Sequence, residues 1–208
     1  MSRASSASPR SRRPPAASEC LTSVFATRPV KEGEEVGDIT IYTIGHSNRG
    51  VDEFVALLKA NGVGTLADIR KLPGSNKYPH FNQEELAASL AQVGIRYVYL
   101  KGLGGRRRQN KDSRNTAWRN RSFRAYADHM ETDEFREGVL ALLGYANDSS
   151  IAIMCSEAVW WRCHRALVAD YLKAAGVNVY HIMGESAAKP HPYTSAAKVV
   201  DGKLSYHA

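Results

Sequence analysis

The segment MCSEAVWWRCHR, residues 154–165, combines several side chains that carry out chemistry in proteins. Cys155 offers a thiol, Glu157 a carboxylate, and Cys163 and His164 a second thiol next to an imidazole. Cys155 ends an apolar run that predicts a strand, and helix amides or a nearby arginine can activate a thiol at such a junction. The segment therefore fits a nucleophile, a metal site or the start of a buried helix, and its residues leave all three open.

Phosphatase or rhodanese chemistry is disfavoured by the residues around Cys155. The spacing from Cys155 to Arg162 is one residue longer than the C-x5-R loop of cysteine phosphatases. An anion cradle needs small residues and glycine, whereas Trp160 and Trp161 are bulky.

A metal site is not assigned from the sequence. On a helix through this segment, Cys163 shares a stripe with Leu167, which is typical of a core position. His164 lies about 100° around that helix from Cys163, so the two would not face one ion. A metal site would need Cys155, His46 and His181 to converge from separate loops, and no cofactor is required by the sequence.

Other polar residues follow predicted strands in the same way. In an open parallel sheet, ligands bind outside the carboxyl ends of the strands. The titratable residues at these ends are candidate catalytic groups, and nearby glycine, serine and arginine residues are candidate ligand-binding groups. The catalytic candidates are His46, Asp68, Cys155, Glu157, His164 and His181, and the ligand-binding candidates are Gly45, Ser47, Arg70, Ser75, Gly104, Gly105 and Arg165.

Alternating strand and helix patterns position these residues. Apolar, β-branched runs predict five strands, and amphipathic segments between them predict helices, the last over 158–176. Asn82 is expected to cap the second helix, because Glu85 falls at its third position. This alternation predicts an α/β fold: one three-layer, Rossmann-like domain with about five mainly parallel strands and helices on both faces. The expected strands cover 39–44, 64–69, 94–100, 150–155 and 177–182, and a small hairpin is expected over 198–206 with its turn at Asp201-Gly202.

Composition limits the class of protein. The chain has 208 residues, a net charge of +7 and three cysteines. Residues 1–38 are rich in Ser, Arg, Pro and Ala, which predicts a disordered leader before the 39–208 domain. No run reaches the roughly 18 apolar residues of a membrane span. The odd cysteine count favours a reducing, cytoplasmic location.

A basic insertion around 104–124 holds most of the excess charge. Eight basic residues and one acid lie between Arg106 and Arg124, and Trp118 and Phe123 are interleaved with them. Cations that hold a phosphate backbone and rings that stack on bases suit nucleic acid, while a solvated insertion is the alternative. The candidate nucleic-acid contacts are Arg106, Arg107, Arg108, Lys111 and Arg114.

Five ordered motifs resemble those of the "domain of unknown function 488" family. They are TIGHS (43–47), DIRKLPGS with the following Phe81, LGG (103–105), the C-x-E…CHR block (155–165) and HI (181–182). The resemblance runs from about Ile39 to about Tyr206, and it implies an α/β fold and a shared site without a known reaction. It adds Pro73 and Cys163 to the candidates above. The chain departs from the family pattern at Trp160-Trp161 and in the length of the basic insertion.

The site is better defined than the reaction. The leading hypothesis is an enzyme or ligand-binding domain for a small phosphate-bearing or nucleotide-like ligand. In it, Cys155, Glu157 and His46 carry out the chemistry, and Arg70 and Arg165 hold the anion. The alternatives are a nucleic-acid-binding module that uses 106–124 and a thiol redox or metal-binding sensor. The oligomeric state and any enzymatic activity are left open.

Overall fold

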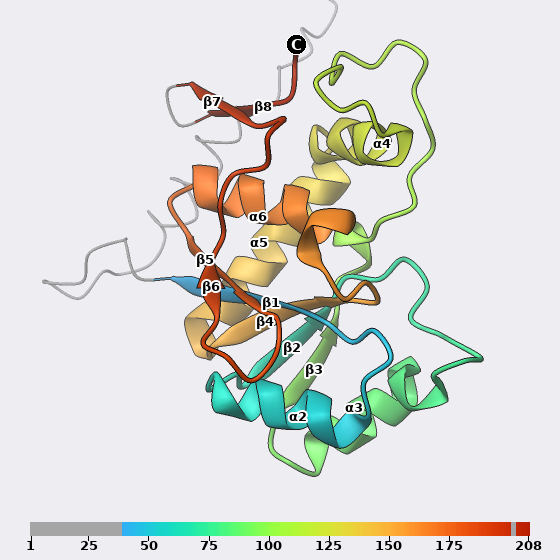
Figure 1. The fold of residues 1–208 in the computed structure, drawn as a ribbon, viewed down its shortest axis with the longest axis vertical. Coiled ribbons are helices and arrows are strands. Elements are labelled where there is room, and N and C mark those ends of the chain that lie inside the picture. The colour runs from blue at the N-terminus through green and yellow to red at the C-terminus, as the bar shows by residue number, and fades with distance from the viewer. Residues whose placement is uncertain (1–38, 201–202) are drawn as a thin grey trace, which may run out of the picture.

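A central sheet with helices on both sides forms the domain (Figure 1). The computed structural model describes residues 39–200 and 203–208, so the predicted leader and the turn at Asp201-Gly202 lie outside the described residues. The helices are α2 (Val51–Ala60), α3 (Gln83–Ala91), α4 (Arg121–Met130), α5 (Asp133–Asp148) and α6 (Arg165–Ala174). The strands are β1 (Thr40–Gly45), β2 (Thr65–Asp68), β3 (Arg96–Tyr99), β4 (Ile151–Cys155), β5 (Asn178–Ile182), β6 (Lys189–Pro190), β7 (Lys198–Val200) and β8 (Lys203–Ser205).

The sheet has six strands in the order β3-β2-β4-β1-β5-β6. The first five in this order pair in parallel, which confirms the predicted mainly parallel α/β fold. The two-residue strand β6 adds an antiparallel edge beside β5 that the sequence pattern did not predict. Its pairs join Tyr180 with Pro190 and His181 with Lys189, so the C-terminal segment lies along the sheet edge.

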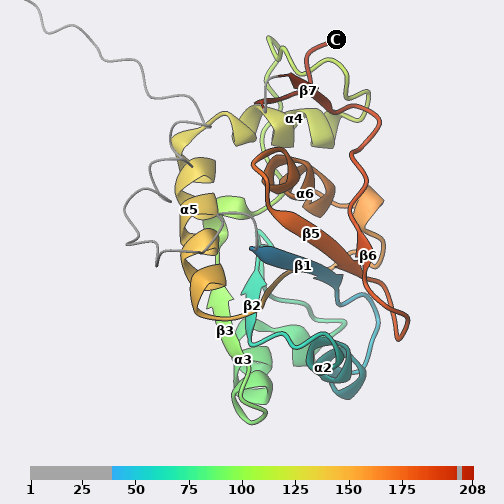
Figure 2. The ribbon, with the colours of Figure 1, turned by 90° about the vertical axis from the view of Figure 1, so that its left-hand side faces the viewer.

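The order of the strands creates a switch point between β1 and β4. The chain moves from β1 through β2 to β3 in one direction, and then returns to β4 and passes to β5 in the other. Right-handed crossovers then require α2 and α3 on one face and α5 and α6 on the other, which is the arrangement seen in Figures 1 and 2. Because the connections after β1 and β4 leave towards opposite faces, a crevice is expected at their carboxyl ends.

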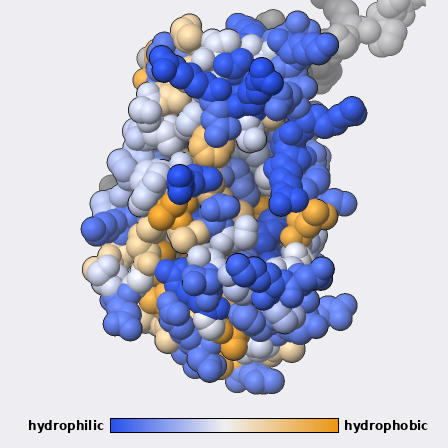
Figure 3. All heavy atoms as spheres, turned by 45° about the vertical axis from the view of Figure 1, so that its right-hand side comes forward, coloured by the Kyte–Doolittle hydropathy of each residue, from blue (hydrophilic) through white to orange (hydrophobic). Residues whose placement is uncertain are grey.

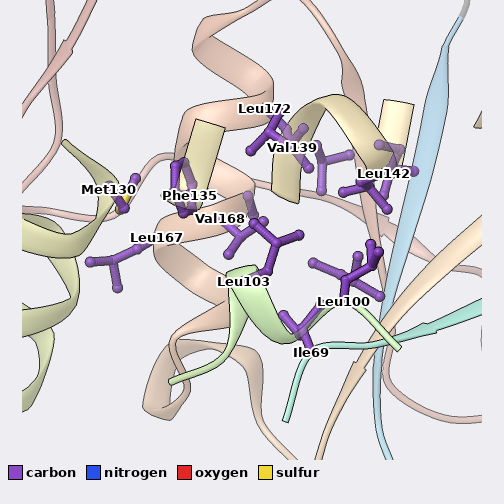
Figure 4. Packing of buried hydrophobic residues seen from close by; sticks show 14 of the residues in the cluster. Ile69, Leu100, Leu103, Met130, Phe135, Val139, Leu142, Leu167, Val168 and Leu172 are labelled. Carbon is purple, nitrogen blue, oxygen red and sulfur yellow. The ribbon is translucent and has the colours of Figure 1, made fainter. Parts of the chain in front are cut away.

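Two hydrophobic clusters, one on each face, hold the layers together. In β4, Ile151 and Ile153 belong to the cluster beneath α5 and α6, while Ala152 and Met154 belong to the cluster beneath α2 and α3. Figure 4 shows the first cluster. This alternation places Cys155, the next residue, on the α6 face of the sheet.

The predicted helix over 158–176 is wrong in its first half. Residues 156–159 form an irregular loop, Trp160–Arg162 form one 3-10 turn, and α6 begins only at Arg165. Cys163 has an extended backbone, with φ −128° and ψ 150°. Cys163 and His164 therefore do not have the helical spacing on which the argument against a shared metal ion depended.

Two smaller expectations also have definite outcomes. Asn82 precedes α3 as expected, but its side chain does not cap that helix; its Oδ1 accepts a hydrogen bond from the Ser75 backbone N–H at 2.6 Å. The strands β7 and β8 pair antiparallel, which confirms the predicted hairpin strands.

Among the described residues, no helix is long and apolar enough to cross a membrane.

Candidate functional site

A cavity of about 740 Å³ opens at the carboxyl edge of the sheet. Figure 3 shows the side of the molecule towards which β1 runs, and hydrophilic side chains cover most of it. The lining comes from five segments that are distant in sequence. They are residues from 46–47 after β1, 70–78 after β2, 105–106 in the basic insertion, 122–126 at the start of α4, and 155–164 after β4.

Cys155, Cys163 and His164 come together in the lining of this cavity. The Sγ atom of Cys155 lies 3.8 Å from Nδ1 of His164, and the Sγ atom of Cys163 lies 3.6 Å from the same nitrogen. All three donor atoms lie within 4.8 Å of one another. The irregular loop allows this convergence, because it returns Cys163 to the end of β4 before α6 begins.

The imidazole of His164 has a defined orientation. Its Nε2 lies 3.0 Å from the backbone oxygen of Ile69, and a carbonyl oxygen only accepts hydrogen bonds. We therefore assign the proton of the neutral ring to Nε2, which leaves the lone pair of Nδ1 directed at the two sulfur atoms. The ring of Tyr126 packs against this imidazole, with centroids 5.0 Å apart.

The two buried thiols have opposite pKa shifts. Burial raises the pKa of Cys163, but the hydrogen bond from Cys155, the charge of Arg165 and the Arg165 backbone N–H outweigh burial and lower it from 9.0 to about 6. The hydrogen bond to Cys163 and burial raise the pKa of Cys155 from 9.0 to about 12. Within the pair the proton is therefore held more tightly on Cys155 than on Cys163, a residue that the sequence pattern had placed in the core.

His46 directly follows β1, where its backbone N–H donates to the Cys155 oxygen at 3.0 Å, and its side chain is neutral. Burial and the charge of Arg70 lower its pKa from 6.5 to about 4, against the hydrogen bond to Ser47. Its Nδ1 donates to the Ser47 oxygen at 2.9 Å, so the lone pair of Nε2 faces Nη1 of Arg70 at 3.4 Å. The ring stacks on Phe81 with centroids 4.3 Å apart.

Asp68 and Arg70 form a buried ion pair next to His46. Nη2 of Arg70 lies 2.5 Å from Oδ2 of Asp68, and their side chains are 5% and 0% exposed. Arg70 also donates to the backbone oxygen of Phe81, while Tyr97 donates to Asp68. Arg70 lines the cavity, but its charge is already matched by Asp68.

Arg165 holds the irregular loop instead of lining the cavity. It is fully buried, and its Nη2 donates to the backbone oxygen of Glu157 at 2.5 Å. The same oxygen lies against Gly45, where an added Cβ would be only 1.8 Å away. Glycine is required at this position because β1 and the loop after β4 are in direct contact.

His181 lies in a buried network on the α6 side, away from the cavity lining. Its Nδ1 lies 2.7 Å from Oγ1 of Thr43 and its Nε2 lies 2.8 Å from Nδ1 of His191, whose Nε2 bonds Asp170 at 2.9 Å. Burial and the charges of His191 and Arg165 lower the pKa of His181 from 6.5 to about 3. Trp160 stacks on His181 with centroids 4.3 Å apart. The network joins β1, β5, α6 and the C-terminal segment.

Of the predicted nucleic-acid contacts in the basic insertion, Arg106 lines the cavity. Arg106 has a positive φ of 55°, whereas Arg107 pairs with Glu134 at 2.8 Å. Trp118 and Phe123 pack on each other with centroids 4.9 Å apart, so these rings already have partners. The remaining nucleic-acid candidates, Arg108, Lys111 and Arg114, are exposed, and nucleic-acid binding there stays a prediction.

Some of the remaining predicted site residues line the cavity, and the cavity also has lining residues that were not predicted. Ser47, Ser75, Gly105 and Glu157 line the cavity, as do the unpredicted Lys71, Lys77, Tyr126 and Arg162. Gly104 is buried against Lys71, with an added Cβ 3.1 Å from the Lys71 Cα. Lys71 directly follows Arg70 in the loop predicted after the second strand, so its position in the sequence could have indicated that it lines the cavity. Nothing in the local pattern indicated Tyr126, Thr43, Asp170 or His191.

The fold and the cavity define an α/β domain with a candidate ligand site at its strand ends. The family described as "Domain of unknown function DUF488" matches residues 50–172, and the chain belongs to this family. The match includes Asp68, Arg70 and the block from Cys155 to Arg165, but it is shorter than the expected resemblance and leaves out His46 and His181. A search of curated proteins and a search of solved structures found no match.

Proposed function

We propose that the protein is an enzyme that binds a small phosphate-bearing ligand in the cavity and acts on it with the Cys155–Cys163–His164 cluster. The charge of the cavity lining carries this proposal. Lys71, Lys77, Arg106 and Arg162 line the cavity, and within residues 39–200 and 203–208 none of them forms an ion pair. Glu157 is the single carboxylate in the described lining.

The size and shape of the cavity support the same conclusion. A volume of about 740 Å³ falls within the range of about 300–1,000 Å³ for small-molecule sites. Tyr78 adds aromatic surface suited to a flat ring such as a nucleobase. Ser47 and Arg106 both line the cavity with positive φ, at 51° and 55°. Such backbone strain in residues other than glycine is concentrated at functional sites.

The reactive groups and the cations have complementary tasks. Unpaired lysine and arginine side chains stabilise phosphate oxygens through charge-assisted hydrogen bonds. The cysteine and histidine cluster supplies nucleophilic or metal-binding atoms in the same lining, to which His46 adds a neutral imidazole. The shifted pKa values of Cys155, Cys163 and His46 are typical of catalytic sites.

Calorimetric titration with AMP, and separately with inorganic phosphate, tests the proposal. A charge-assisted hydrogen bond contributes about 1.5–3 kcal/mol, so Arg106→Ala and Lys71→Ala should each weaken AMP binding by about tenfold or more. Glu157→Gln should strengthen binding, because it removes the opposing charge.

Arg108→Ala is the matched control, since Arg108 is exposed and does not line the cavity. Its affinity should stay within about threefold of the wild type, a change below 1 kcal/mol. Equal affinities for the wild type and all three lining variants would show that these side chains do not bind the anion.

A further inference from the structure

We propose that Cys155, Cys163 and His164 bind one zinc ion in the lining of the cavity. The inference deepens the proposed function, because it names an ion that the same site would use. The role of this ion in the reaction rests on the proposed function. Binding of the ion itself depends only on the three ligand atoms and their surroundings.

The distances between the donor atoms fit a tetrahedral zinc site. Zinc binds sulfur at about 2.3 Å and nitrogen at about 2.0–2.1 Å, so a sulfur and a nitrogen on one tetrahedral ion lie about 3.5 Å apart. The observed distances from Nδ1 of His164 are 3.6 Å to Cys163 and 3.8 Å to Cys155. Each sulfur-to-nitrogen distance is therefore within a few tenths of an ångström of that in a tetrahedral site, and the two sulfur atoms lie within 4.8 Å of each other.

The surroundings of His164 are those of a metal ligand. A ligating histidine usually donates its other ring N–H to a carbonyl or carboxylate, which fixes the tautomer and directs the free lone pair at the metal. Nε2 of His164 makes this contact with the backbone oxygen of Ile69 at 3.0 Å. Gly105 lies against the His164 ring, where an added Cβ would be 2.9 Å from Nδ1. A larger residue at position 105 would therefore obstruct the ligand nitrogen.

The chemistry of the donors selects the ion. Thiolate sulfur and imidazole nitrogen favour zinc and other soft or borderline ions over magnesium or calcium, which prefer oxygen. Two thiolates and a neutral imidazole also give Zn²⁺ a net charge of zero, which suits a site in which both cysteines are buried. The Arg165 backbone N–H lies 3.5 Å from Sγ of Cys163 and can hydrogen-bond a ligated sulfur.

Three protein ligands leave the fourth position of a tetrahedral ion for water or substrate, as in catalytic zinc sites. All three ligands line the cavity that also holds Lys71 and Arg106. The ion would therefore lie where a bound phosphate-bearing molecule can reach it.

Metal analysis of the full chain tests the inference. The wild type, dialysed against zinc and then against buffer, should retain one zinc per chain by mass spectrometry. Cys155→Ser and Cys163→Ser should each lose most of it. Cys20→Ser is the matched control, because Cys20 is the remaining cysteine and lies outside the described residues, and it should retain the wild-type content.

Cobalt replacement guards against variants that lose metal only because they misfold. Cobalt added to metal-free wild type should give the visible and near-ultraviolet absorption of tetrahedral thiolate ligation, and His164→Asn should shift that spectrum. Absence of both retained zinc and cobalt absorption in folded wild type would overturn the inference, as would zinc retained after both cysteines are replaced.

The same samples distinguish this inference from the proposed function. If AMP binds in an Arg106-dependent manner but no metal is retained, the zinc site is wrong and the anion site stands. If zinc is retained but neither AMP nor phosphate binds, the zinc site stands and the anion site is wrong.

Discussion

Replacing Gly45 with alanine should destabilise the protein, because β1 directly contacts the loop that holds the cysteine and histidine cluster. The new Cβ would lie 1.8 Å from the Glu157 oxygen and 2.8 Å from Nη2 of Arg165. The oxygen would have to retreat to at least 3.0 Å, which disturbs its hydrogen bond with buried Arg165. Overpacking costs about 1–3 kcal/mol, and a weakened hydrogen bond to a charged group about as much again.

We therefore expect Gly45→Ala to lower the free energy of unfolding by about 3 kcal/mol, measured by urea titration. Gly144→Ala is the matched control. Gly144 lies in α5 with nothing within 4 Å of an added Cβ, so alanine should stabilise the helix by about 0.5–1 kcal/mol. An unfolding midpoint for Gly45→Ala at or above that of the wild type would refute the reasoning, since it would mean that the contact is absent in solution.

Two further predictions concern the buried side chains of His46 and Arg70. The pKa of His46 is lowered from 6.5 to about 4 in the folded protein, so the unfolded chain binds the proton first as the pH falls. The stability that neutral His46 contributes is therefore present above pH 6.5 and is lost as the pH falls towards 4. Urea unfolding should show a loss of about 2–3 kcal/mol from His46 by pH 4.5, and His46→Asn should flatten this pH dependence; an unchanged slope would contradict it. Arg70→Met should cost about 3–5 kcal/mol, because it leaves Asp68 buried without its cation. The exposed control Arg108→Met should stay within about 0.5 kcal/mol of the wild type, and equal losses in the two variants would contradict the buried pair.

The parallel sheet was predictable because its strands are short, apolar and separated by amphipathic segments. The common orientation of parallel strands was also sufficient to predict that His46, Arg70 and Cys155 lie at one edge of the sheet. The two-residue strand β6 was not predictable, because its pairing with β5 comes from tertiary contact. A two-residue strand containing proline has no periodicity to detect.

The site was harder to predict because the residues around Cys163 have the spacing of an amphipathic helix without forming one. Cys163 and Leu167 have the spacing of one helix face, yet the backbone of Cys163 is extended and α6 begins only at Arg165. The hydrogen bond from Arg165 to the Glu157 oxygen satisfies a loop carbonyl without a helix. Long-range contacts of this kind, which also place Asp170 beside His191, leave no pattern in the local sequence.

Soaking crystals with tungstate, a phosphate mimic with strong anomalous scattering, would show whether the cavity binds a phosphate-bearing ligand. We expect an anomalous peak inside the cavity, within hydrogen-bonding distance of Lys71, Arg106 or Arg162, and its loss in Arg106→Ala crystals. Tungstate bound only elsewhere on the surface, with the cavity empty at the same concentration, would contradict the claim that this lining binds a phosphate-bearing ligand.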